Sequence, residues 1–224
     1  MEREWEERVR RAVARYRDGE ARLPEEQDER QRQLTRLGNA AWAAGLSLLA
    51  LERREEAAGW LRRAAERYRE SWPLAPPESW GRPIAAMKAS LLAGDREGAR
   101  EDARACLAAG AAGSASPIGR YAAALAHLVL GEDEAARGLA ATLLREEGFP
   151  RPAATALAAL AGGDAGGYAE AARSLLADFE RREAFLEDVP VADTVLVLQL
   201  LARERGSEAE LASPLLLAVP AETG

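Results

Sequence analysis

The residue types that most often catalyse reactions or bind metals are almost absent from this sequence. Cys106 is its only cysteine, His127 its only histidine and Lys88 its only lysine among 224 residues. One cysteine excludes an intrachain disulfide, and one cysteine with one histidine is too few for the usual zinc sites. A phosphate-binding P-loop needs a lysine after a glycine run, whereas Lys88 follows Ala-Ala-Met. We therefore expect no metal and no other cofactor.

Clustered positive charge and long apolar runs are also missing. The formal net charge is −7, which argues against nucleic acid as a partner because phosphate binding needs a concentrated basic surface. The arginines alternate with glutamates, as in REWEERVRRAVARYR, a pattern typical of a solvated, ion-paired helix face. The N-terminus has no apolar signal core, and no stretch approaches the roughly 18 apolar residues of a membrane span. We expect a soluble, cytoplasmic protein without a membrane partner.

Alanine and helical spacing dominate what is present. Apolar residues make up 48% of the chain but aromatic residues only 5%, and alanine is the best helix former. Apolar positions recur every three or four residues, as at Trp5, Val9 and Tyr16, which predicts helices. We expect a single all-α domain over residues 1–224. Its predicted parts are an N-terminal helix within 1–22, helical hairpins across 25–181, and a capping helix with a tail across 186–224.

The turns between the predicted helices repeat. They read LLAGDREGAR, LVLGEDEAAR and ALAGGDAGGYAEAAR, and each joins an apolar helix end to a glycine and then to an acid that can cap the next helix. Successive turns are about 30 to 42 residues apart, which is the range of helix-pair repeats. Ser116-Pro117 is a further start signal, because serine caps a helix and proline suits its first position.

These features resemble the tetratricopeptide repeat over about residues 34–181. The matching positions are Gly45, Leu48, Ala57, Leu61 and Ala64 in one unit, Gly94, Ala99, Ala103 and Cys106 in the next, and Gly131 and Ala136 in the third. Trp42 lies one place from the motif's tryptophan, and the first unit lacks its closing proline. The resemblance implies a short right-handed solenoid of about four helical hairpins, with a concave surface that binds a partner.

The most apolar stretch is LEDVPVADTVLVLQLL, residues 186–201. As a strand it has no partner elsewhere in the chain, and a helix that is apolar on every side is a buried helix. We therefore predict a buried C-terminal helix, capped by Asp188 and holding Pro190 in its first turn.

The segment WPLAPPESWGRPIAAMK, residues 72–88, is the candidate binding site. Trp72, Trp80, Arg82 and Lys88 supply residue types that are enriched at binding hot spots, on a loop stiffened by proline. The sequence leaves a second interpretation open, in which Trp72 and Trp80 only fill a gap at an irregular repeat step.

No pair of residues has the pattern of a catalytic site. Ser114, Ser116 and Cys106 are near His127 in sequence, but none lies in a glycine-flanked elbow, and the helical neighbours of His127 are apolar. We expect a non-enzymatic module that binds a protein or peptide. The alternatives are a small-molecule sensor or enzyme with a pocket near His127 and Lys88, and a homo-oligomer formed through the apolar tail SPLLLAVP.

Overall fold

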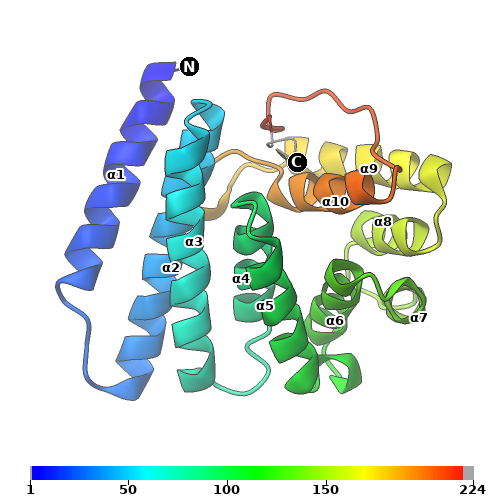
Figure 1. Ribbon diagram of the computed structural model, residues 1–224, viewed down its shortest axis with the longest axis horizontal. Helices are drawn as coiled ribbons and strands as arrows, with labels where there is room; N and C mark the ends of the chain where they lie inside the picture. The colour runs from blue at the N-terminus through cyan, green and yellow to red at the C-terminus, as the bar shows by residue number, and fades with distance from the viewer. Residues whose placement is uncertain (1, 219–224) are drawn as a thin grey trace. The chain divides into compact units, whose positions relative to one another are not determined.

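All regular structure in the computed structural model is helical over residues 2–218, the residues it describes, which confirms the all-α class (Figure 1). In chain order the helices are α1 (Glu2–Glu20), α2 (Gln27–Ala50), α3 (Arg54–Ser71), α4 (Gly81–Leu92), α5 (Arg96–Ala108), α6 (Pro117–Leu130), α7 (Asp133–Leu143), α8 (Arg151–Ala161), α9 (Ala165–Glu180) and α10 (Asp193–Glu204). Short 3₁₀ turns are η1 (Trp72–Leu74), η2 (Ala111–Gly113) and η3 (Leu186–Asp188). Within this range, no helix has both the length and the apolar content needed to cross a bilayer.

The contacts divide the chain into two compact units. Unit 1 comprises the described residues up to Gly98, Ala184–Val191, and the described end of the tail from Leu217. Unit 2 comprises Ala99–Glu183 and Ala192–Leu216. The expectation of one domain over residues 1–224 stays a prediction.

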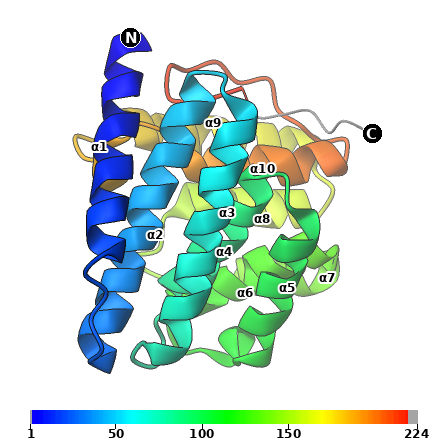
Figure 2. The same cartoon turned by 60° about the vertical axis from the view of Figure 1, so that its left-hand side comes forward.

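In unit 1, helix α2 is the central element. Helices α1 and α3 both pack on α2, and α4 packs on α3; Figures 1 and 2 show α1, α2 and α3 side by side. Every residue from 40 to 49 is buried, because this part of α2 is small or apolar on all sides. Gly45 permits the close approach of α3, since a Cβ at that position would lie 2.6 Å from Leu61 Cγ.

In unit 2, consecutive helices from α6 to α9 pack on one another, and α10 packs on α8 and α9. The predicted start of α6 is confirmed: the Ser116 hydroxyl accepts a hydrogen bond from the Ile118 amide, and Pro117 is the first helical residue. Asp164 caps α9 in the same way, accepting from the Gly167 amide at 2.9 Å. The packed pairs α6–α7 and α8–α9 agree with two of the expected hairpins.

The predicted C-terminal helix exists and is buried, but its expected start is wrong. Helix α10 begins at Asp193, and residues 195–198 are buried. Asp188 does not cap it: Asp188 has a left-handed φ of 59° and belongs to the separate turn η3, and Pro190 precedes the helix. The contacts of η3 with Arg8 and Arg15 of α1 outweigh the tendency of Asp188 to cap a helix.

The C-terminal tail up to Leu216 packs within unit 2. The Ala192 amide donates to the Leu215 carbonyl at 2.9 Å, and the Ser213 hydroxyl bonds to Glu180 at 2.8 Å. Gln199 of α10 donates to the Ala209 carbonyl at 2.7 Å. Residues 219–224 lie outside the described residues, and a homo-oligomer formed through SPLLLAVP stays a prediction.

Candidate functional site

The two tryptophans of the predicted binding segment pack against each other. Their ring centroids are 6.2 Å apart, with the ring planes at 60°. Trp80 is only 7% exposed, and its buried indole Nε1 has no hydrogen-bond partner among the described residues. Trp72, in η1, is half-buried. Most of the surface of this tryptophan pair therefore faces other parts of the protein.

Arg82 is held by neutral groups of two other helices. Its Nε donates to the Ser71 hydroxyl at 2.7 Å, and its Nη2 donates to the side-chain oxygen of Gln31. Ser71, fully buried, donates in turn to the Gln31 carbonyl at 3.0 Å. Partial burial lowers the pKa of Arg82 because it disfavours the charged form. Arg82 thus ties the start of α4 to α2 and α3.

Lys88, the fourth predicted residue, lies in α4 and is 8% exposed. The structure therefore brings Trp72, Trp80 and Arg82 together around the start of α4, and withdraws Trp80 and Lys88 from the surface. A role of these four residues in binding stays a prediction.

The residues with reactive side chains have other surroundings. His127 belongs to unit 2, and its Nδ1 lies 2.6 Å from a carboxylate oxygen of Glu132. Burial, assisted by the charge of Asp102, raises the pKa of the Cys106 thiol to about 12. Among residues 2–218, no group of three or more histidine, cysteine, aspartate or glutamate residues is placed to hold a metal.

A different site opens along α1 in unit 1. It is a groove of about 500 Å³, which we call the α1 groove. Its lining residues are Glu6, Val9, Arg10, Val13, Ala14, Arg17 and Arg53. Six of the seven come from one side of α1, and Arg53 directly precedes α3.

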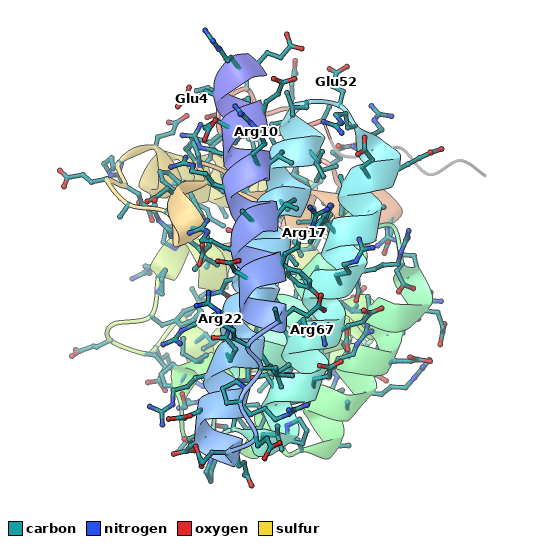
Figure 3. All side chains as sticks on the ribbon, turned by 90° about the vertical axis from the view of Figure 1, so that its left-hand side faces the viewer. Glu4, Arg10, Arg17, Arg22, Glu52 and Arg67 are labelled. Carbon is teal, nitrogen blue, oxygen red and sulfur yellow. The ribbon has the colours of Figure 1, made fainter. Side chains whose placement is uncertain are left out.

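Helix geometry explains how α1 presents this side. Ala12 and Tyr16 are buried on the stripe that packs on α2. Val9 and Val13, four residues apart, lie one above the other on the neighbouring stripe and are only half-buried. Figure 3 looks onto α1, with Arg10 and Arg17 along it and Arg67 of α3 beside it.

Side chains of α3 fix the far end of α1. Arg67 donates to the Tyr16 hydroxyl at 2.9 Å and pairs with Glu20. Tyr16 also meets Trp60 edge to face, with centroids 5.3 Å apart. Arg53, just before α3, lines the groove with Glu6, and Arg67 near the end of α3 contacts Tyr16 and Glu20. Helices α1 and α3 therefore run in the same direction, and the groove follows α1.

The rim of the α1 groove is basic. It carries three arginines and one glutamate, a formal net charge of +2 in a chain of −7. Arg10 pairs with Glu7 and Arg53 with Glu56, both within one helical turn and both exposed. The hydrogen bonds that Arg53 donates to the Glu56 carboxylate raise the pKa of Arg53, with a smaller contribution from the charge of Glu6. Arg17 has no ion-pair partner among the residues that the structure describes.

Sequence reasoning missed this site. The spacing of Val9 and its apolar neighbours predicted a helix, but it did not indicate that Val9 and Val13 stay partly exposed. The available signal was the pair Arg10 and Arg17, seven residues apart and therefore on the same stripe of the helix as the valines.

No protein-family model, curated protein or solved structure matches this chain. The chain itself presents an all-α protein whose first unit carries an open groove with an apolar floor and an arginine rim. That groove is the candidate functional site.

Proposed function

We propose that the protein is a non-enzymatic module that binds a protein or peptide segment in the α1 groove. The observation that carries the proposal is the half-buried pair Val9 and Val13 inside a rim of arginines. A partly exposed apolar strip gains free energy when a partner covers it. Arginine and the nearby aromatic residues are also the types that dominate binding energy at interfaces.

The helical arrangement supports a tetratricopeptide-like, right-handed solenoid as the architecture of this module. Pairs α2–α3, α6–α7 and α8–α9 pack as hairpins, and Gly45 meets Leu61 at the small-residue position that the resemblance predicts. Gly94 and Gly131 have left-handed φ values of 74° and 77° at the turns, where glycine avoids a steric penalty. Stacked helix pairs present extended grooves to partners.

The same geometry favours binding over catalysis. The α1 groove contains arginine and glutamate but no nucleophile, and neither His127 nor Lys88 lines it. The high thiol pKa of Cys106 leaves almost no thiolate near neutral pH. Such a free, unreactive cysteine also suits the cytoplasm, where we place the protein.

The test is selection of peptides by the full-length protein. A phage-displayed library of random peptides of about 16 residues, long enough to follow three to four helical turns, is panned on the immobilised chain. Recovered peptides are then measured on Val13→Asp, which puts a charge on the apolar floor. Ala105→Asp makes the same kind of change at an exposed position of α5 and serves as the control.

We expect the recovered peptides to lose at least about tenfold in affinity on Val13→Asp, since a buried unpaired charge costs more than 1.4 kcal/mol, and to bind Ala105→Asp normally. Circular dichroism verifies that both variants are helical. Failure to recover any peptide, or equal binding to both variants, overturns the proposal.

A further inference from the structure

We propose that the segment bound in the α1 groove is an acidic amphipathic helix. Its apolar side chains cover Val9 and Val13, and its carboxylates pair with Arg10, Arg17 and Arg53. The inference rests on the proposed function and adds the chemistry of the partner.

The charge of the α1 groove favours an acidic partner. The groove has a formal charge of +2, and Arg17 has no carboxylate partner among the described residues. Within the part of the chain that the structure describes, Arg10 and Arg53 pair only with exposed neighbours three residues away. Such surface pairs are weak, so a partner carboxylate can replace them at little cost. A bidentate arginine–carboxylate pair would then form on a partly covered surface, where it is stronger.

On its other flank, α1 already binds a segment through an arginine–carboxylate pair. In unit 1, Arg15 pairs with Glu187 at 2.7 Å, and Arg8 Nε donates to the Asp188 carbonyl at 3.0 Å. The adjoining Val189 is 3% exposed. The η3 segment thus places the Glu187 carboxylate and the Asp188 backbone carbonyl on arginines of α1, next to a buried apolar side chain. Arg10 and Arg17 repeat the seven-residue spacing of Arg8 and Arg15 on the groove side.

The shape of the α1 groove favours a helical partner. From Glu6 to Arg17 the groove follows 12 residues of α1, and the 11 steps between them cover about 16 Å at 1.5 Å per residue. A groove that follows one side of a helix accepts a second helix along it, which is a common mode of peptide recognition. Three turns of a partner helix would match this length and carry apolar residues at the three- and four-residue spacing that meets both valines.

An extended polyanion is a poorer match. RNA or DNA would carry its phosphates beyond the groove and meet a chain of net charge −7, whereas a short acidic helix meets only the basic rim. The apolar floor also has no complement in a phosphate backbone.

The experiment uses a second displayed library, of helical peptides with leucines fixed along one face and every other position randomised among glutamate, lysine and glutamine. The full-length protein selects from this library as wild type, as Arg17→Glu and as Arg11→Glu. Arg11 lies on the same helix, is exposed, has no partner among the described residues, and does not line the groove. The two variants therefore carry the same charge reversal about 120° apart around α1, and only Arg17→Glu changes the groove.

On wild type and on Arg11→Glu we expect glutamate to outnumber lysine several-fold among recovered peptides. On Arg17→Glu that ratio should fall towards one. A recovered acidic peptide, measured by fluorescence anisotropy, should bind Arg17→Glu about five- to tenfold more weakly than wild type, as the reversal turns an attraction into a repulsion. Raising the salt from about 0.05 M to 0.5 M should reduce that difference, because screening shortens the range of charge interactions.

Absence of a charge preference, or the same preference on both variants, overturns the acidic helix. If those peptides still lose affinity on Val13→Asp, the proposed function survives and only the partner chemistry is wrong. Recovery of no peptide from either library overturns both.

Discussion

Replacement of Gly45 by alanine tests the closest helix contact in unit 1. Gly45 is buried in α2, and a Cβ there would lie 2.6 Å from Leu61 Cγ, 2.8 Å from Leu61 Cδ2 and 3.3 Å from the Leu61 backbone nitrogen. Real Cβ atoms do not approach other carbon atoms this closely. The side chain of Leu61 is itself fully buried, so it has no empty space to enter, and α3 must move away from α2.

Two opposing effects set the size of the change. Alanine favours a helix over glycine by about 1 kcal/mol, whereas forcing an extra carbon into a packed core costs about 1–3 kcal/mol. The nearby backbone nitrogen places the cost in the upper part of that range. We expect Gly45→Ala to lower the free energy of unfolding by about 1–2 kcal/mol after the helix gain is subtracted.

Gly59→Ala is the matched control. Gly59 lies within α3, and its nearest neighbour to an added Cβ is Arg63 Nη1 at 3.7 Å, an ordinary contact. The helix gain of about 1 kcal/mol should therefore appear alone, as added stability. Because α2 and α3 pack as one pair, both variants report on the same part of the protein.

Urea unfolding followed by circular dichroism at the helical band measures both changes. The two variants should move the urea midpoint in opposite directions. In a thermal scan of the same variants, each 1 kcal/mol should shift the thermal midpoint by about 2–4 °C for a chain of this size. If Gly45→Ala stabilises the protein as much as Gly59→Ala does, the close approach of α2 and α3 is wrong.

Two further predictions concern unit 2. Burial raises the pKa of Cys106 from its ordinary 9.0 to about 12, so at pH 8 iodoacetamide should label the folded chain about a thousandfold more slowly than the urea-unfolded chain; equal rates would contradict the burial. The pKa of Cys106 is higher in the folded chain than in the unfolded chain. Burial of the neutral thiol therefore contributes stability to the fold that is complete below pH 9 and is lost as the pH rises towards 12. Arg205→Ala should lower the free energy of unfolding by about 2 kcal/mol, because Arg205 bonds to Asp133 at 2.6 Å and to the Leu128 carbonyl at 2.7 Å. Arg173→Ala, at an exposed position of α9, should stay within about 0.5 kcal/mol of wild type in the same denaturant measurement, and an equal loss in both would refute the assigned role of Arg205.

Local chemistry explains which parts of the fold could be predicted from the sequence. The cap at Ser116, the first-turn proline at 117 and the left-handed glycines at 94 and 131 depend only on neighbouring residues, and the structure has them as expected. The start of α10 could not be predicted in this way. The contacts that hold η3 come from Arg8 and Arg15, more than 170 residues earlier in the chain.

The surroundings of the candidate binding residues could likewise not be predicted from the sequence. The types of Trp80 and Arg82 suit a binding surface, but their exposure depends on which helices cover them. Arg82 finds its acceptors on Gln31 of α2 and Ser71 of α3, and no spacing along the chain indicates that meeting. Likewise, Val9 and Val13 have the spacing of core residues, and they stay partly open because no described element of unit 1 fills the groove beside them.

The two flanks of α1 connect these observations. One flank places Arg8 and Arg15 on η3, where Glu187 and Asp188 both adopt left-handed φ values near 60°. Such a conformation costs about 1 kcal/mol or more for each residue that is not glycine. The arginine contacts and the burial of Val189 must outweigh that cost for the segment to stay in place. The other flank has arginines at the same spacing, Arg10 and Arg17, but none of residues 2–218 forms a segment that covers it. A partner helix with ordinary backbone angles would gain comparable contacts there without the strain, which is why the groove side of α1 is the surface on which a partner should bind.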